Sequence, residues 1–215
     1  MNIKKFPNFK PVILLEKNNI WAYDNLKKIL KKNNQNKLKI ISNLNGISNK
    51  LVFAIGYTKK IRKNFLTKNK VFIVHNSKLP LDRGWSPMQA QVLRGNNKIF
   101  ITLFEANNFI DKGLVALKIS YNLDGTELND ELRLKQSVNS IKIINLYLKN
   151  LSKIKLKPQK GKATYNKKRN YFSNLININK SIKSQFNILR VSDNNHYPAH
   201  FNYKGIKYFL KIKKK

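Results

Sequence analysis

The 215-residue chain contains no cysteine and only three histidines, His75, His196 and His200. The absence of cysteine excludes disulfide bonds, thiolate metal ligands and a thiol nucleophile. Three histidines without any cysteine are a poor basis for a structural zinc site, so we expect no metal. Glycine and proline are also scarce, at eight and six residues, whereas chains disordered along most of their length are usually rich in them. We therefore expect the chain to fold.

Long hydrophobic runs are lacking as well. The N-terminal segment contains lysines but only one brief apolar run, at residues 11–15, which ends at Glu16. That run is too short for the hydrophobic region of a signal peptide, and no later run approaches the length that spans a bilayer. These features favour a cytoplasmic protein that does not bind a membrane.

Acidic residues are few, because 10 Asp and Glu stand against 44 Lys and Arg, which gives a formal net charge of +34. Such a charge is typical of proteins that bind a polyanion, for example tRNA, DNA or an anionic membrane surface. The lysines are spread along the whole chain, however, and are accompanied by many asparagines and isoleucines. An AT-biased genome would give the same composition without functional pressure. The charge therefore favours phosphate-bearing ligands without identifying a nucleic-acid-binding protein.

Apolar runs bounded by turn-forming residues alternate with helical patterns through most of the chain. The expected strands are residues 11–16, 39–42, 51–56, 71–74, 98–104 and 114–121. The expected helices begin after Asn18 or Asn19, at Ser86-Pro87, and at Asp124 or Thr126. This alternation predicts an α/β fold with a doubly wound, mostly parallel, Rossmann-like sheet.

The last of these helices is expected to end near Leu151, and its apolar residues recur at steps of three and four, as one buried face requires. They are Leu134, Val138, Ile141, Ile144 and Leu148. Residues 153–170 are rich in lysine and break the pattern, so we expect a basic linker between a main domain at 1–152 and a small C-terminal extension at 171–215. In the extension, residues 182–190 are ambiguous and residues 199–212 predict a hairpin.

His75 follows the expected strand at residues 71–74, and Asp111 lies in a loop further along the chain. Ligands of open α/β sheets bind outside the carboxyl ends of the strands. A histidine and an aspartate in such a place can exchange protons or stabilise a developing oxyanion. A purely structural hydrogen bond would have the same spacing. Neither a serine nucleophile elbow nor a cysteine is present, so covalent catalysis is not indicated.

The residues around His75 resemble a known family. GYTKKIRKNFLTKNKVFIVHNSKLPLDRGWSP, followed by ITLFEANNFIDKGLVALK, is similar to the formyltransferase fold family, whose members transfer a formyl group from 10-formyltetrahydrofolate to an amine. Three features carry the resemblance: Gly-Tyr after a strand, His-x-Ser-x-Leu-Pro-x-x-Arg-Gly-x-x-Pro, and Asp-x-Gly in a loop 36 residues beyond the histidine. The resemblance is strong over residues 50–120.

The resemblance implies a role for each of these residues. His75 and Asp111 would be catalytic, with His75 stabilising or protonating the tetrahedral oxyanion and Asp111 orienting His75 or relaying the amine proton. The residues expected to bind the folate donor are Gly56, Tyr57, Glu105, Asn107 and Ile110. The residues expected to contact the acceptor are Ser77, Arg83 and Trp85.

One position departs from the family pattern, which usually has an asparagine two residues before the histidine as an oxyanion donor. Ile73 occupies that position here. We hypothesise that Asn76 or a backbone N–H supplies the hydrogen bond, because losing such a donor commonly costs on the order of 10²–10³ in rate. A chain of weakened activity that acts as a basic RNA-binding protein is the alternative from another functional class.

The C-terminal sequence NILRVSDNNHYPAHFNYKGIKYFLKI looks like the small C-terminal segment of sugar N-formyltransferases. That resemblance implies an amino sugar as the acceptor, carried on a nucleotide, and a role in surface polysaccharide biosynthesis. Glycinamide ribonucleotide and Met-tRNA are the alternative acceptors within the enzyme class, and apart from Met-tRNA no nucleic acid partner is expected. The helix ending near Leu151 and the hairpin are candidate surfaces for a homodimer.

Overall fold

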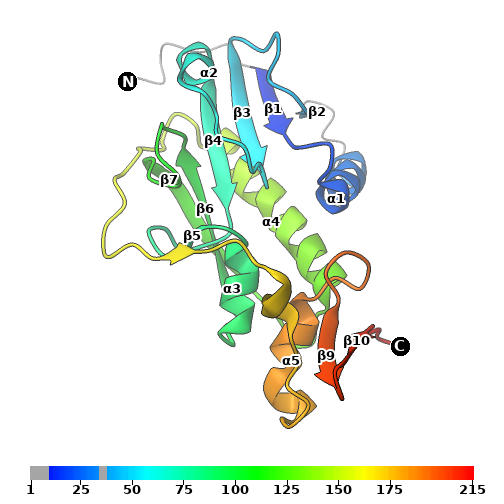
Figure 1. The fold of residues 1–215 in the computed structure, drawn as a ribbon. Helices are drawn as coiled ribbons and strands as arrows, with labels where there is room; N and C mark the ends of the chain where they lie inside the picture. Colours follow the sequence, from blue (N-terminus) through cyan, green and yellow to red (C-terminus); the bar gives the residue numbers. More distant parts are fainter. Residues whose placement is uncertain (1–9, 34–37) are drawn as a thin grey trace.

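The computed structural model describes residues 10–33 and 38–215, which contain a six-stranded mixed sheet (Figure 1). Its strands, in spatial order, are β2 (Lys39–Ile41), β1 (Lys10–Leu14), β3 (Lys50–Ile55), β4 (Lys70–His75), β6 (Lys98–Glu105) and β7 (Val115–Asn122). The first four strands pair in parallel, and β6 and β7 follow in antiparallel pairings. The predicted α/β fold with a mostly parallel sheet is confirmed.

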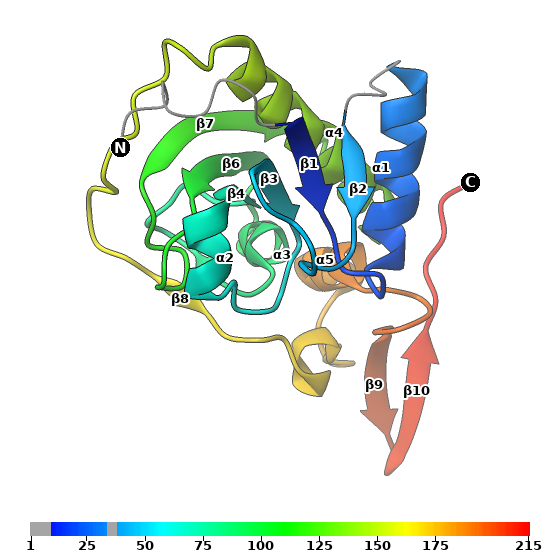
Figure 2. The ribbon, with the colours of Figure 1, turned by 90° about the horizontal axis from the view of Figure 1, so that it is seen from above.

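Helices cover both faces of this sheet (Figure 2). The helices on one face are α1 (Ile20–Lys32) and α4 (Asn129–Lys149), and the helix on the other is α2 (Lys63–Lys68). Side chains of a strand point alternately to its two faces. Ile13 and Phe53 therefore lie in the core under α1 and α4, whereas Val12 and Val52 lie in the core beside α2.

Helix α4 buries only part of the face that its apolar pattern predicts. Leu134 and Val138 are 47% and 45% exposed, so the prediction that they are buried is wrong. The face toward the sheet contains Ser137 and Ser140 instead, and each hydroxyl donates a hydrogen bond to the carbonyl four residues earlier. A count of apolar residues overlooks such small polar side chains. The remaining residues of the predicted face are in the core, with Ile141 and Ile144 buried and Leu148 partly buried.

The C-terminal residues form a helix and a hairpin. The segment that was ambiguous in the sequence is α5 (Ile182–Val191), which contacts α3 (Pro87–Leu93) of the main domain. The strands β9 (Ala199–Tyr203) and β10 (Ile206–Leu210) pair antiparallel, so the predicted hairpin is confirmed. Lys204 and Gly205 form its turn with φ angles of 47° and 77°, as a two-residue hairpin turn with the right twist requires.

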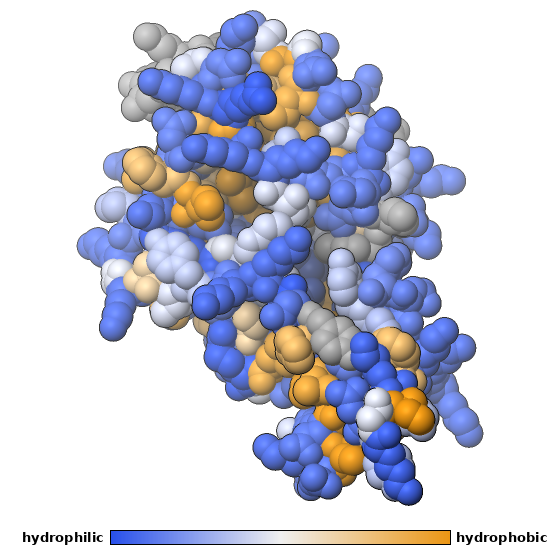
Figure 3. All heavy atoms as spheres, in the orientation of Figure 1, coloured by the Kyte–Doolittle hydropathy of each residue, from blue (hydrophilic) through white to orange (hydrophobic). Residues whose placement is uncertain are grey.

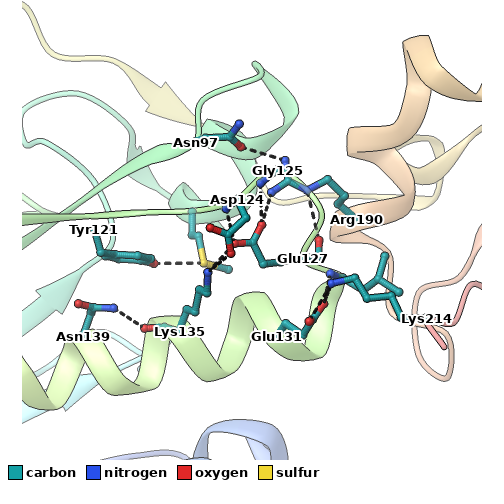
Figure 4. A network of polar contacts seen from close by, with 12 residues as sticks. Asn97, Tyr121, Asp124, Gly125, Glu127, Glu131, Lys135, Asn139, Arg190 and Lys214 are labelled. Atoms are coloured by element: carbon teal, nitrogen blue, oxygen red, sulfur yellow. Dashed lines mark hydrogen bonds and ion pairs between the residues drawn. The ribbon is translucent and has the colours of Figure 1, made fainter.

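A buried ion pair joins α5 to the main domain (Figure 4). Nη2 of Arg190 lies 2.9 Å from Oε2 of Glu127, and the two side chains are 2% and 3% exposed. Nζ of Lys135 lies 2.6 Å from the other carboxylate oxygen. Burial alone would raise the pKa of Glu127, but the hydrogen bonds from Lys135 and from the Asp124 N–H outweigh burial and lower that pKa to about 2. The carboxylate is therefore ionised in the fold.

The same carboxylate shapes the turn before α4. It accepts hydrogen bonds from the N–H groups of Asp124 at 2.6 Å and Gly125 at 3.1 Å, which holds these residues outside the helix. The helix begins only at Asn129, where the N–H of Leu128 donates to the side chain of Glu131. The prediction that the helix starts at residue 124 or 126 is therefore wrong.

Residues 153–170, expected as a linker, run along the main domain before they reach the C-terminal segment (Figure 2). Strand β8 (Tyr165–Asn166) pairs in parallel with β5 (Arg83–Gly84), and Lys157 exchanges two backbone hydrogen bonds with Val115. The segment therefore contacts two loops of the main domain. The division into residues 1–152, 153–170 and 171–215 stays a prediction. Among the residues that the structure describes, no helix is long and apolar enough to cross a membrane.

Candidate active site

His75 ends β4 at the carboxyl edge of the parallel strands, as the sequence predicts. Alternation along β4 gives His75 and Ile73 the same face of the sheet. Ile73 packs there beside Tyr57 and Ala106, on the side covered by α2. His75 itself is only 7% exposed. The position of the family's asparagine is thus occupied by a side chain that belongs to an apolar cluster.

The two ring nitrogens of His75 have different surroundings. Nε2 lies 2.7 Å from the carbonyl oxygen of Asp82, and since a carbonyl oxygen can only accept, Nε2 carries the proton. In the neutral ring Nδ1 then has a free lone pair. Nδ1 lies 3.9 Å from Oδ2 of Asp111, which is too far for a direct hydrogen bond. Two acceptors therefore face each other across a gap that a group with N–H bonds can bridge.

Asp111 is fixed on the opposite side of this gap. Its Oδ2 accepts a hydrogen bond from the N–H of Gly84 at 2.7 Å, and its φ angle is 51°. Aspartate is one of the few residues other than glycine that adopt this left-handed conformation. A Cβ at Gly113 would lie 1.6 Å from the carbonyl oxygen of Glu105, so that position requires glycine. The Asp-x-Gly motif therefore has a steric reason.

The loop after His75 is held by its own polar side chains. The hydroxyl of Ser77 donates to the carbonyl of Leu81 at 2.7 Å, and the carbonyl of Ser77 accepts from the hydroxyl of Thr102 at 2.6 Å. Asp82, with a φ of 57°, forms an ion pair with Arg94 at 2.6 Å. Ser77 is fully buried and its hydroxyl bonds within the loop, so its contact with an acceptor stays a prediction.

Arg83 and Trp85 follow in the same loop and differ in exposure. Arg83 is 8% exposed, and its guanidinium donates to the hydroxyl of Tyr165 at 2.9 Å and to Oε1 of Gln159 at 2.6 Å. Trp85 is 40% exposed, and Nζ of Lys168 lies 5.2 Å from its ring centroid. Trp85 therefore offers a flat surface beside a cation, whereas Arg83 is engaged by side chains of the 153–170 segment.

The residues expected to bind the donor lie on two sides of the site. Gly56 and Tyr57 follow β3, which neighbours β4. Tyr57 is half-buried, and burial together with the nearby carboxylate of Glu16 raises its pKa. The hydroxyl of Tyr57 therefore stays protonated near neutral pH and can donate a hydrogen bond.

The loop between β6 and β7 contains the other three. Glu105 forms an ion pair with Lys70. Oδ1 of Asn107 accepts from the N–H of Phe109 at 2.9 Å, so the Asn107 side chain shapes the loop. Ile110 is 70% exposed and Phe109 is 66% exposed. The loop thus presents apolar surface next to Asp111.

Asn76, next to His75, has a buried side-chain oxygen that accepts no hydrogen bond from the described residues. It is 3% exposed, its carbonyl accepts from Nε2 of Gln91 at 2.6 Å, and its Oδ1 is buried without a hydrogen-bond partner among the described residues. A buried amide oxygen without a partner costs about 1–3 kcal/mol. Such a group is expected to be retained where a ligand uses it.

Comparison with known families adds to this geometry. The model of the formyl transferase family matches residues 4–145, which include His75 and Asp111. The chain belongs to the formyl transferase family. Within the described residues, no group of three or more histidine and carboxylate side chains could hold a metal ion.

The chain resembles several proteins of the formyl transferase family. Methionyl-tRNA formyltransferase of Thermosipho melanesiensis is 33% identical over 135 residues, which are 63% of this chain and 43% of the relative. The chain spans less than half the length of such curated relatives.

Solved formyltransferase structures share the fold. Methionyl-tRNA formyltransferase of Clostridium thermocellum has a TM-score of 0.74 at 20% identity and covers 92% of this chain and 88% of its own. A sugar N-formyltransferase from Shewanella has a TM-score of 0.65 at 14% identity and covers 95% of this chain and 97% of its own. HypX of Aquifex aeolicus in complex with tetrahydrofolic acid has a TM-score of 0.67 at 16% identity, over 94% of this chain and 37% of its own.

Two contacts of this candidate site were not predicted from the sequence. The partner of His75 Nε2 is a backbone carbonyl, at Asp82, and backbone contacts leave no signal in residue type. Gln159 contacts the Asp111 loop from a segment that reads as a linker. Its residue type gives no distinct signal, because the same segment also contains the amides Asn166 and Asn170. Neither contact follows from a motif spacing.

Proposed function

We propose that this protein transfers a formyl group from 10-formyltetrahydrofolate to the amine of a small acceptor. The observation that carries the proposal is the 3.9 Å gap between Nδ1 of His75 and Oδ2 of Asp111, each anchored by a separate backbone contact. An amine in that gap would donate to both acceptors. Anchored groups lose little freedom when substrate binds, which favours catalysis.

Chemically, a bond from the amine nitrogen to the formyl carbon forms and the bond from that carbon to N10 of the donor breaks. One proton leaves the amine and one joins N10. The carboxylate of Asp111 would accept the amine proton and relay it to Nδ1 of His75. The protonated ring would donate to the oxyanion that develops on the formyl oxygen and then give this proton to N10 as the bond from the formyl carbon to N10 breaks. The bond from Nε2 to the Asp82 carbonyl fixes the ring for this task.

The proposed donor, 10-formyltetrahydrofolate, is a substrate that supplies an activated formyl group when bound. The site has apolar and aromatic surface that fits such a ligand. Exposed Ile110 and Phe109 provide apolar and aromatic surface in the Asp111 loop, and half-buried Tyr57 provides an aromatic ring after β3. Oδ1 of Asn76 is a buried acceptor without a partner among the described residues, and an N–H or O–H of a bound substrate would satisfy it. Gly56, Glu105 and Asn107 would shape the pocket through the loops that they hold.

For the acceptor we propose an amino sugar carried on a nucleotide. Trp85, 40% exposed with Lys168 over its ring, provides a stacking surface and a cation for a phosphorylated ligand. The near-complete mutual coverage with the sugar N-formyltransferase fold is consistent with this. Met-tRNA is the second candidate, favoured by the 33% identity to a methionyl-tRNA formyltransferase and by the charge of +34.

One assay panel tests these alternatives. The protein is incubated with 10-formyltetrahydrofolate and, separately, UDP- and dTDP-linked amino sugars, glycinamide ribonucleotide and Met-tRNA. Mass spectrometry then detects the addition of one formyl group. Formylation of a nucleotide-linked amino sugar supports the proposal, formylation of Met-tRNA alone would replace it by the second candidate, and no product with any acceptor contradicts formyl transfer to these classes.

A homodimer, a cytoplasmic location and a role in surface polysaccharide synthesis stay predictions. Apolar side chains gather over the C-terminal segment, at the lower end of Figure 3. They include Phe172, Ile178, Ile182, Ile206 and Phe209. Contiguous exposed apolar surface is typical of an interface. Light scattering during gel filtration measures whether the protein is a dimer, and a monomer at high concentration would contradict that prediction.

A further inference from the structure

Gln159 lies in the 153–170 segment and uses both ends of its side-chain amide. Nε2 donates to the carbonyl of Asp111 at 2.8 Å and to the carbonyl of Gly113 at 2.9 Å. Oε1 accepts from Nη2 of Arg83 at 2.6 Å. One half-buried side chain therefore joins the loop that carries Asp111 to the loop that follows His75.

The hydrogen bond from Gln159 to the carbonyl of Asp111 stabilises an unfavourable backbone conformation of Asp111. A left-handed residue other than glycine costs roughly 1–2 kcal/mol, and Asp111 has a φ of 51°. Gln159 holds the carbonyl of Asp111, and the N–H of Gly84 holds its carboxylate at 2.7 Å. Together these contacts fix both ends of the residue.

The hydrogen bond between Gln159 and Arg83 connects Gln159 to the loop that follows His75. Arg83 precedes Gly84, whose N–H binds the Asp111 carboxylate, and follows Asp82, whose carbonyl binds His75. Backbone pairing of β5 with β8 supports this loop, because the N–H of Arg83 donates to the carbonyl of Thr164 at 2.9 Å. A shift of Gln159 would thus move both sides of the gap between His75 and Asp111.

We propose that Gln159 is a positioning residue for formyl transfer, which sets the separation of His75 and Asp111 without touching the reacting atoms. The proposal rests on the proposed function. A displacement of about 1 Å at a reacting group can cost on the order of 10² in rate, so loss of this contact should act on kcat. Binding of the acceptor at Trp85 should be affected little, because the hydrogen bonds of the Gln159 side chain go to Arg83, Asp111 and Gly113.

The test uses Gln159→Glu. A carboxylate keeps the acceptor for Arg83 but replaces the donor with an oxygen that faces the carbonyls of Asp111 and Gly113. The matched control is Lys160→Gln, at the next position, which is exposed. We expect kcat of Gln159→Glu to fall about 10- to 100-fold with KM for the acceptor within about twofold, and the control to be unchanged.

A second readout does not depend on activity. Hydrogen exchange of the Gly84 amide reports on its bond to Asp111, and the Trp85 amide, which donates to the carbonyl of Asn166, reports on β5–β8 pairing. We expect Gln159→Glu to speed exchange at Gly84 but not at Trp85. If Gln159→Glu does not fold, Gln159→Met is used instead and judged by the same outcomes. Its side chain forms none of these hydrogen bonds and does not repel the carbonyls of Asp111 and Gly113.

The outcomes separate the two proposals. An active wild type whose variant keeps kcat within twofold, or a variant with unchanged exchange at Gly84, overturns the role of Gln159. Equal acceleration at Gly84 and Trp85 also overturns it, because the side chain would then only support the strand pairing. A wild type without formyl transfer contradicts the proposed function, and exchange at Gly84 still tests whether Gln159 holds Asp111.

Discussion

Nδ1 of His75 lies 3.9 Å from Oδ2 of Asp111, although His75 ends strand β4, Asp111 lies in the loop between β6 and β7, and the two do not bond to each other directly. Each is held by a backbone group of the segment that follows β4. His75 binds the carbonyl of Asp82, and Asp111 binds the N–H of Gly84. Two residues of one turn thus set the distance between the groups proposed to act on the amine.

Asn76→Ala tests the hypothesis for the missing oxyanion donor. We expect kcat to fall about 10²- to 10³-fold, because Asn76 is the buried amide next to His75 and Ile73 lacks a polar group. The melting temperature should stay the same or rise, since the variant removes an unpartnered acceptor. Steady-state kinetics and thermal unfolding measure both effects, and an unchanged kcat would remove Asn76 from the site.

Gly113→Ala tests the steric reason for the Asp-x-Gly motif. The new Cβ would lie 1.6 Å from the Glu105 carbonyl oxygen, so the loop must move and carry Asp111 with it. We expect formyl transfer to be lost and the melting temperature to fall. Gly161→Ala is the control, because a Cβ there meets nothing within 4 Å and only the φ of 101° is unfavourable. Equal activity of the two variants would contradict the steric account.

Arg190→Met tests the ion pair that joins α5 to the main domain. The variant removes a buried charge-assisted hydrogen bond and leaves Lys135 as the cation that pairs with Glu127, so we expect a loss of about 1.5–3 kcal/mol in the free energy of unfolding. The control is Lys214→Ala, which removes an exposed pair with Glu131 and should cost about 0–1 kcal/mol. Urea unfolding measures both, and a similar loss in the two variants would contradict the importance of the buried pair.

The low pKa of Glu127 predicts how stability depends on pH. The folded pKa, about 2, lies below the ordinary value of 4.5, so the folded protein binds the proton less readily than the unfolded chain. The contribution of Glu127 to stability is therefore fully present above pH 4.5 and is lost as pH falls toward 2. The difference in unfolding free energy between wild type and Glu127→Gln should shrink over this range, and a constant difference would contradict the assignment.

Much of the fold was predictable because its signals are local. All six strands of the main sheet lie within two residues of the expected bounds, since short apolar runs between turn residues identify buried strands. His75 and Asp111 were also predictable, because each follows or precedes a strand within a motif. The hairpin was predicted with a turn at Tyr203-Lys204-Gly205, and the structure places the turn at the last two of these residues.

What was not predictable depends on contacts between distant segments. The buried face of α4 includes Ser137 and Ser140, which hydrophobicity does not reveal. Helix α5 was ambiguous because its buried residues include polar ones, among them Arg190, whose burial depends on its ion pair with the carboxylate of Glu127 and on further hydrogen bonds. Gln159 is a similar case, because its contacts are with the carbonyls of Asp111 and Gly113, which lie more than forty residues earlier in the sequence.

The measurement that tests the central claim most directly is the rate of formyl transfer from 10-formyltetrahydrofolate to a nucleotide-linked amino sugar by wild type and Asp111→Asn. The amide keeps the shape of the side chain but cannot accept the amine proton as the carboxylate does. The account predicts transfer by the wild type, a fall in kcat of about 10²- to 10⁴-fold in the variant, and little change in melting temperature. A variant that retains more than about a tenth of the wild-type kcat would contradict a catalytic role for Asp111.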